Sequence, residues 1–415
     1  MELDVVEILK DMVRLDTSNN NEYLMTDYIA NILGKCGIEF DIIEPAQGRK
    51  SIISILGDKS EENPIAFISH IDVVSANESE WKYKPFDATQ EDGFIYGRGT
   101  LDTKFLTAIS LVTFIKLSQE PLNRQIIFIA SADEEQGSKL GMPHVVHKYK
   151  DLLRNALVIN EGGGFLVENK KDKFYTCTAG EKGRCEVHIK IEGTPSAASF
   201  PNQNRSTHKF LKVLERLSNY EFEIEENDVY KKYVSLLGSD IESPLLQGYK
   251  DYNCKNIIML PTYEIGEAVN IMPKNIEFNF SVQLLPSKTQ EDTERIVKDI
   301  LDGLDLTYEI KEFIQGFSSD CTSEFFEELE SITQKYFCKD ARLLPVYALG
   351  RTDGRFLGNI PADVYGASLV SPKIPFKDVI KIVHQANEKV DVDTLNLGVE
   401  AYLELAKKMG MKKIG

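Results

Sequence analysis

The sequence has few of the features that mark secreted, disulfide-stabilised or membrane-spanning proteins. Its six cysteines contain no C-x-x-C pair, which favours reduced thiols over a disulfide framework or a zinc ribbon. No stretch approaches the roughly 20 apolar residues needed to cross a bilayer. The N-terminus alternates acidic and apolar residues, without the basic start and unbroken apolar core of a signal peptide. We therefore expect a cytoplasmic protein without a membrane partner.

Two further classes of protein are disfavoured by what the chain does not carry. Its 65 acidic residues outnumber the 48 basic ones, and the net charge of -17 repels phosphate backbones. No G-x-S-x-G motif marks a serine nucleophile on an α/β sheet. We expect no nucleic-acid partner and no chemistry that depends on such a serine.

The length of 415 residues predicts two domains, because a single hydrophobic core rarely grows this large. Near the N-terminus, short apolar runs alternate with a helical pattern, which is an α/β rhythm. Buried strands are predicted at 64–69 (PIAFIS), 125–130 (QIIFIA) and 156–159 (ALVI), with a crossover helix over 100–117 behind a threonine suited to an N-cap.

The sequence pattern changes at 180–183 (GEKG), where a strand of alternating polar and apolar residues predicts a half-exposed sheet. A mixture of strands and helices follows, typical of a small α+β domain, before the chain returns to an α/β pattern. We therefore predict an α/β domain in 1–183 and 314–415, interrupted by a smaller α+β domain in 184–313.

Histidine and acidic side chains follow the predicted strands. His70 and Asp72 lie after the first strand, three acids (133–135) after the second, and Glu161 after the third, while Asp102 opens the crossover helix. Each feature alone fits a blander interpretation, such as a surface histidine or an acid favoured by a helix dipole. Ligands bind beyond the carboxyl ends of the strands in open α/β sheets, and these groups all fall there. Their coincidence predicts a site.

The chemistry of these side chains indicates a catalytic metal centre. Histidine and carboxylate ligands without cysteine suit zinc or a similar divalent ion, and a ligand set with open positions is catalytic. Cobalt and manganese are alternatives. Two adjacent metals would explain the number of acids.

Several sequence blocks resemble the di-zinc metallopeptidase family of carnosinase-like dipeptidases, aminoacylase, glutamate carboxypeptidase, acetylornithine deacetylase and succinyl-diaminopimelate desuccinylase. They are FISHIDVVSA, DGFIYGRGTLDTKF, ASADEEQGSKLG, INEGGG, GRTDGRF and HQANE, and they span nearly the whole chain. The resemblance implies a zinc-peptidase-like catalytic domain with a mixed sheet flanked by helices. It also implies that the inserted domain is a lid that often mediates dimerisation, so a homodimer is expected.

The same resemblance assigns the metal ligands. Asp102 would bridge two zinc ions, with His70 and Glu161 completing one site and Glu135 and His384 completing the other. Two cations lower the pKa of a shared water and polarise the scissile carbonyl, so no nucleophilic side chain is needed.

The two remaining catalytic assignments support these ligands. Asp72 would fix the ring orientation of His70 from behind. Glu134 would be the general base, taking a proton from the metal-bridging water and passing it to the leaving amine. Of these two neighbours, Glu134 would thus act as the base and Glu135 as a metal ligand.

The chain departs from the family pattern at several positions. Ala197 stands where relatives carry a lid histidine that stabilises the oxyanion, either as a natural divergence or as an engineered substitution. Gln283 replaces a common arginine and Arg351 a common glycine, which suggests altered specificity. Asn270 and Arg355 are candidate substrate-binding residues, although Arg355 could equally form a structural salt bridge.

We therefore predict a zinc-dependent hydrolase that cleaves an amide bond in a dipeptide or N-acyl amino acid by attack of metal-bridging hydroxide. The motifs do not choose between a dipeptidase, a carboxypeptidase and a deacylase. The alternative is a catalytically weakened relative that binds a peptide or metabolite because Ala197 replaces the histidine. A single-metal phosphoesterase is more distant, since basic groups for phosphate are sparse near the motifs.

Overall fold

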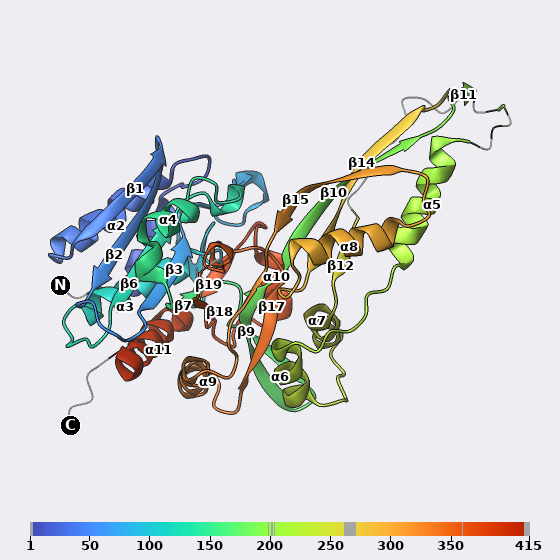
Figure 1. Cartoon of the computed structure of the whole chain (residues 1–415). Coiled ribbons are helices and arrows are strands. Elements are labelled where there is room, and N and C mark those ends of the chain that lie inside the picture. The colour runs from blue at the N-terminus through green and yellow to red at the C-terminus, as the bar shows by residue number, and fades with distance from the viewer. Residues whose placement is uncertain are drawn as a thin grey trace.

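The computed structural model describes residues 3–197, 199–200, 202, 204–260, 271–358 and 360–410. Figure 1 shows a large body from which a narrow arm of strands extends. Segments from both ends of the chain build the body, and the middle of the chain builds the arm. Within the described ranges, no helix combines the length and apolar character needed to span a bilayer.

The body is organised around a mixed sheet, which has ten strands among the described residues. β3 runs parallel to its neighbours β6 and β7, whereas β2 runs antiparallel to β6. The order across the sheet is β1 (Phe40–Ala46), β2 (Arg49–Leu56), β6 (Ile126–Ser131), β3 (Ile65–His70), β7 (Leu157–Asn160), β18 (Asp363–Gly366), β9 (Asp172–Glu181) and β16 (Phe317–Ser318), with β8 (Leu166–Asn169) and β17 (Arg342–Ala348) also paired to β9.

Alternate residues of the central strands pack in two different cores, because successive side chains of a strand point to opposite faces. Ile65 and Phe67 of β3 belong to a core shared with α1 (Val5–Arg14), α2 (Glu22–Lys35), α3 (Lys104–Leu117), α9 (Glu324–Tyr336) and α11 (Val392–Gly410). Ala66 and Ile68 belong to a second core, shared with α4 (Met142–Leu153). Helices therefore cover both faces of the sheet and leave its strand ends to form a site.

A small sheet beside the body joins distant parts of the chain. It pairs β4 (Thr89–Glu91) with β5 (Phe94–Tyr96), and β5 with β19 (Lys389–Asp391). Because β19 lies just after the turn that holds His384, this pairing brings that turn close to the chain segment leading to Asp102.

The arm has a hydrophobic core of its own, which supports the inserted-domain architecture. Its sheet has the order β12 (Ile257–Met259), β14 (Asn275–Leu284), β10 (Gly183–Glu192) and β15 (Thr307–Ile314), and is covered by α5 (Ser206–Asn219) and α8 (Gln290–Leu301). At the tip, β11 (Ser196–Ala197) pairs with β13 (Ile271–Met272). The fold class is thus the predicted one, an α/β body with an inserted α+β domain.

Two helices from the middle of the chain pack on the body instead of on the arm. α6 (Asp228–Leu237) and α7 (Pro244–Cys254) contribute Val229, Tyr233 and Tyr249 to the core of the body. The Tyr252 hydroxyl donates to the carbonyl of Ala348, 2.8 Å away at the end of β17. The bounds 184–313 for the inserted domain stay a prediction, and within them α6 and α7 anchor the arm to the body.

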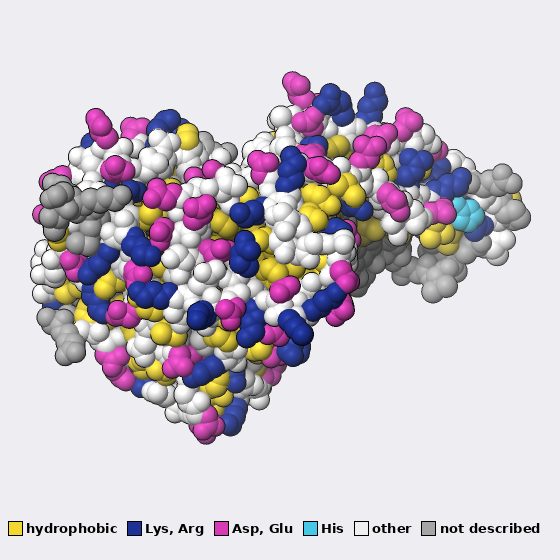
Figure 2. All heavy atoms as spheres, turned by 90° about the horizontal axis from the view of Figure 1, so that it is seen from below, with side chains coloured by type: hydrophobic (Ala, Val, Ile, Leu, Met, Phe, Trp, Pro, Cys, Tyr) yellow, Lys and Arg dark blue, Asp and Glu magenta, His cyan; other side chains and the backbone are white. Residues whose placement is uncertain are grey.

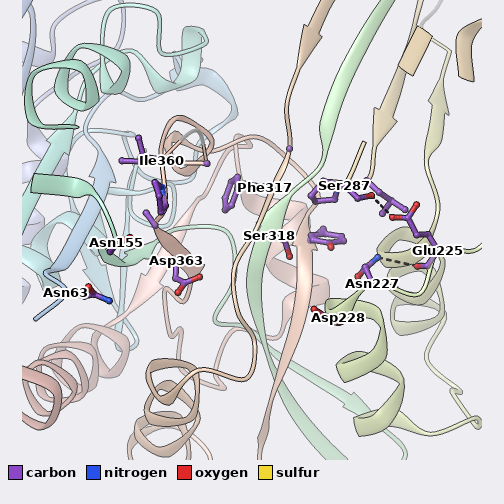
Figure 3. Close-up of a pocket in the computed structure, with 17 residues that line it drawn as sticks. Asn63, Asn155, Glu225, Asn227, Asp228, Ser287, Phe317, Ser318, Ile360 and Asp363 are labelled. Atoms are coloured by element: carbon purple, nitrogen blue, oxygen red, sulfur yellow. Dashed lines mark hydrogen bonds between the residues drawn. The ribbon is translucent and has the colours of Figure 1, made fainter. Parts of the chain in front are cut away.

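A groove of about 800 Å³ lies where the arm meets the body (Figure 3). It is lined by Glu225 and Asn227 before α6, by Ser287 after β14, and by Asp363 of β18. Glu225 already pairs with Lys288, and no histidine lines the groove. The face drawn in Figure 2 shows acidic and basic side chains interspersed instead of one field of a single sign.

Candidate active site

The carboxyl ends of three neighbouring strands position the first half of the site. His70 is the last residue of β3 and is opposite Ser131, the last residue of β6. The chain leaving β6 forms the 3-10 turn η2 (Glu134–Gln136), and the chain leaving β7 carries Glu161. Because β6, β3 and β7 are adjacent and parallel, their terminal groups meet at one edge of the sheet.

The carboxylate of Asp102 lies between two imidazoles. One of its oxygens is 3.1 Å from His70 Nε2, and the other is 2.8 Å from His384 Nε2. Each imidazole also approaches one glutamate: His70 Nε2 is 3.4 Å from Glu161 Oε2, and His384 Nε2 is 3.2 Å from Glu135 Oε2. The five predicted ligands therefore come together as two sets that share Asp102.

His384 reaches this site from the far end of the sequence. It follows α10 (Phe376–Ile382) in a turn before β19, and its backbone has a left-handed φ of 61°. Histidine is one of the few residues with a side chain that adopts this conformation with some frequency. The imidazole is 47% exposed, in contrast to the buried His70, so this side of the site faces solvent.

Asp72 orients its neighbours through two different groups. Its backbone carbonyl lies 3.0 Å from His70 Nδ1, which leaves Nε2 to face the site. Its carboxylate accepts hydrogen bonds from the backbone N–H groups of Glu134 and Glu135, at 3.1 and 3.0 Å. Its side chain therefore mainly holds the turn that carries both glutamates, and lies 3.7 Å from the imidazole.

Glu134 lies beside a buried arginine. The guanidinium of Arg355 lies 3.6 Å from its carboxylate, and the same guanidinium donates to the carbonyl of Thr352 at 2.6 Å and to Ser138 Oγ at 2.9 Å. Burial raises the pKa of Glu134 to about 9, and the nearby Glu161 and Asp353 add to this effect. Arg355, a predicted substrate-binding residue, is buried and engaged with Glu134 in this structure.

The charges of this cluster are suited to bound cations. Burial alone would raise the pKa of Asp102, but the hydrogen bonds from His384 and His70 hold it well below its ordinary value. Burial raises the pKa of Glu161, and Asp102 and Glu135 raise the pKa of His384 to about 10. Bound cations would interact favourably with the same carboxylates that raise the pKa of His384.

One buried oxygen without a hydrogen-bond partner provides an independent test of whether these residues suit a metal ion. Glu135 Oε1 is buried and has no hydrogen-bond partner in the described part of the chain. One ligand atom each from His70, Asp102 and Glu135 lie within 4.8 Å of one another. A buried carboxylate oxygen without a donor is costly, and nitrogen and oxygen ligands suit zinc and similar divalent ions. The residues present therefore fit a metal centre.

The last two predicted residues are Asn270 and Ala197. Asn270 falls outside the described residues. Ala197 is exposed on β11, at the tip of the arm and far from the ends of the body strands (Figure 1). Within one chain, Ala197 therefore does not reach the paired histidines.

A buried ion pair that the sequence analysis missed ties the two halves of the site together. The Glu388 carboxylate accepts from Arg98 at 2.7 Å and from the N–H groups of Leu101 and Asp102 at 2.7 and 2.9 Å. Arg98 also donates to the backbone carbonyl of His384 at 3.2 Å. The pair thus fixes the backbones of Asp102 and His384. Its only signal in the sequence was the presence of both residues in the quoted motif blocks.

Substitution of Glu388 by glutamine should weaken metal binding without removing a ligand. The loss of charge weakens the bond to Arg98, so the His384 turn is held less firmly against Asp102. Loss of such an outer partner lowers metal affinity about tenfold to hundredfold. A competition titration with a chelator measures the change, and the exposed Glu400, substituted by glutamine, is the matched control. An unchanged affinity would remove Glu388 from the positioning role.

Two other buried groups support the glutamate turn. Asp133 has a left-handed φ of 71°, and its carboxylate accepts from Arg49 of β2 and, at 2.7 Å, from the N–H of Leu140. Asp353 is buried and accepts from Ser131 and Ser138. The first acid of the Asp133–Glu134–Glu135 run therefore shapes the turn, and the other two face the site.

Comparison with known proteins identifies the family. Residues 66–408 match the sequence pattern of peptidase family M20/M25/M40. The chain belongs to this family. It is therefore a metal-dependent hydrolase of amide bonds, of the dipeptidase, carboxypeptidase or deacylase type.

Relatives of the family match almost the whole chain. A protein of Staphylococcus aureus (strain N315), named a probable succinyl-diaminopimelate desuccinylase, is 26% identical over 407 residues, which are 94% of each chain. Among solved structures, the M20 metallo-carboxypeptidase Sso-CP2 of Sulfolobus solfataricus has a TM-score of 0.73 at 18% identity and covers 98% of this chain and 99% of its own. The Bacillus subtilis protein YXEP, described as a dinuclear metal-binding M20 peptidase, has a TM-score of 0.56 at 15% identity and covers 97% and 96%.

Proposed function

We propose that this chain is a di-zinc hydrolase that cleaves the amide bond of a dipeptide or an N-acyl amino acid. The observation that carries the proposal is the Asp102 carboxylate between His70 and His384, each of which has one glutamate beside it. His70 and Glu161 would hold one ion, Glu135 and His384 the other, and Asp102 both. When bound, two such cations polarise a carbonyl and acidify a water.

The protein's own residues supply the proton transfer and the positioning. Glu134 lines the same cavity as Asp102 and His384. Burial raises its pKa, and bound cations would lower that pKa again, so that Glu134 could accept a proton from a water and return it to a leaving amine. Arg355 holds this carboxylate from behind, and Asp72 holds the turn on which it stands. Arg98 and Glu388 keep His384 against Asp102.

The proposal is tested by metal analysis combined with a substrate panel. The purified protein, supplied with zinc, cobalt or manganese, is assayed on dipeptides, N-acyl amino acids and a longer peptide with a free carboxyl end. We expect two metals per chain and turnover of at least one of the first two classes. Metal binding without any turnover would favour a binding protein instead, and the absence of metal would overturn the ligand assignment.

Residue 197, the lid position, provides one further test. We propose a homodimer through the arm, in which residue 197 of one chain would serve the site of the other, because Ala197 is exposed on an edge of the arm and remote from its own site. A lost oxyanion donor costs about a hundredfold to a thousandfold in kcat. We expect Ala197→His to recover part of this factor.

A cytoplasmic location remains a prediction from the free cysteines.

Stability should depend on pH in opposite ways with and without metal. The folded-state pKa values of about 9 for Glu134 and about 10 for His384 exceed their ordinary values of 4.5 and 6.5. The metal-free folded state therefore binds more protons than the unfolded state, and this contribution to stability is lost as pH rises toward those raised values. A cation would displace the proton of His384, a proposed ligand, so zinc should bind more tightly at high pH.

We therefore expect zinc to raise the melting temperature more at about pH 8 than at about pH 6. Differential scanning fluorimetry of the metal-free and zinc-loaded protein measures both shifts. The Asp102→Asn variant, which changes the shared ligand, is expected to lose most of the zinc-dependent shift at both pH values. Equal shifts at the two pH values in the unaltered chain would contradict the proposed competition between protons and metal.

A further inference from the structure

The cavity beside the proposed metal ligands has two walls of opposite character. It has a volume of about 390 Å³, and one wall carries Asp102, Glu134, Glu135, Glu161 and His384. The other wall is formed by aromatic and aliphatic side chains from α7, α10 and the end of β17. Those used in the argument are Tyr249, Leu349, Phe376 and Ile380. A bound molecule would therefore contact the acidic cluster and an apolar surface together.

The apolar wall is open to solvent at two of its residues. Leu349 is 49% exposed and Ile380 is 56% exposed, although both are large hydrophobic side chains. Behind them, the ring of Phe376 lies 5.4 Å from that of Phe165 and 6.3 Å from that of Tyr249, so the wall is backed by packed aromatics. Exposed apolar surface inside a concave site is typical of a binding surface for an apolar group.

Arg351 is exposed and lines the same cavity next to Leu349, and no ion pair or hydrogen bond joins it to another residue in the described part of the chain. Two other arginines of the site already have partners. Arg355 donates hydrogen bonds to Thr352 and Ser138, and Arg98 donates to Glu388. A guanidinium in this position would gain from a carboxylate, which its planar fork binds through two hydrogen bonds.

We infer that the substrate carries both an apolar group, packed against Leu349, Phe376 and Ile380, and a carboxylate paired with Arg351. This inference rests on the proposed function and deepens it by naming the substrate class. That class is amino acids with an apolar acyl group and dipeptides with apolar side chains. A charged acyl group such as succinyl fits the apolar wall poorly, because burying its charge there costs free energy.

The carboxylate is tested with matched substrates that differ in one charge. Leu-Leu and N-hexanoyl-leucine are compared with their carboxamides on the zinc-loaded protein and on Arg351→Gln. Bonds to charged groups are worth about a tenfold to hundredfold factor in kcat/KM. We expect that loss for the carboxamides on the unaltered protein and for the carboxylates on Arg351→Gln, with little further loss for carboxamides on the variant. If Arg351→Gln lowered kcat/KM equally for carboxylates and carboxamides, or for neither, the role of Arg351 would be overturned.

The apolar wall is tested with an acyl series and a second variant. From N-acetyl- to N-hexanoyl-leucine, kcat/KM should rise about fourfold for each buried methylene. Ile380→Ser should flatten this rise, whereas Ile224→Ser, at an equally exposed isoleucine that does not line the cavity, should not. N-succinyl-leucine should be a poor substrate. A flat acyl series, or N-succinyl-leucine as the best substrate, would overturn the apolar assignment.

Binding separates this inference from the proposed function. Calorimetry with the zinc-loaded Glu134→Gln variant measures the Kd of N-hexanoyl-leucine and its carboxamide without turnover. A Kd about tenfold or more lower for the carboxylate supports the inference even if no substrate is hydrolysed by the unaltered protein. Equal Kd values overturn it even if hydrolysis is fast. A circular dichroism melt of each variant confirms that its fold is retained.

Discussion

Glu134→Gln should lower kcat by about a hundredfold to ten-thousandfold while both metals stay bound, the range typical of a lost general base. Glutamine keeps the shape of the side chain and cannot take up the proton. The fold should tolerate the change, because the one ion pair of this carboxylate among the described residues is with Arg355 at 3.6 Å, and Arg355 keeps its bonds to Thr352 and Ser138.

Steady-state kinetics and metal analysis of the same preparation distinguish the base from a ligand. KM should change little, because the loss concerns the transition state. Glu168→Gln, at an exposed glutamate of β8, provides the control for the substitution itself. Retention of more than about a tenth of the kcat, well above the expected range, would assign the base to another group. Loss of a metal in this variant would make Glu134 a ligand instead.

Asp102→Asn should have a still larger effect, because it alters the one group shared by both proposed metal positions. The substitution removes the negative charge between His70 and His384 and places a possible N–H donor where one ligand oxygen would be. We expect fewer than two metals per chain and turnover below that of Glu134→Gln.

Elemental analysis after dialysis against a weak chelator measures this loss directly. The matched control is Asp92→Asn, at an exposed position with a left-handed φ of 51°, which asparagine accepts as readily as aspartate. Two tightly held metals in Asp102→Asn, together with turnover near that of the unaltered protein, would remove Asp102 from the bridging role.

Much of the body could be predicted from hydrophobic pattern alone. The run 64–69 is the strand Ile65–His70, 125–130 is Ile126–Ser131 and 156–159 is Leu157–Asn160, each shifted by one residue. Such continuous apolar runs are typical of strands buried on both faces. The crossover helix begins at Lys104 instead of Thr100, because the chain from Gly99 to Asp102 is held by the Glu388 carboxylate.

The hydrophobic pattern of the sequence predicted less where an element's position depends on contacts with residues far away in the chain. The placement of α6 and α7 on the body did not follow from their position in the middle of the chain, since it arises from packing against β17. The pair of Arg98 and Glu388 is separated by 290 residues, and no local rule joins two such charges. Likewise, the bond from the Asp72 carboxylate to the glutamate turn depends on the close approach of two strand ends.

The position of β18 has a consequence for synthesis of the chain on the ribosome. β18 lies between β7 and β9, pairing with β7 in parallel and with β9 antiparallel, although both precede it by about two hundred residues of sequence. Until Asp363–Gly366 emerge, the nascent body keeps unpaired strand edges, which are prone to wrong pairing, while the arm can already fold on its own core. His384 emerges later still, so the growing chain can complete the proposed metal centre only after this residue has been made.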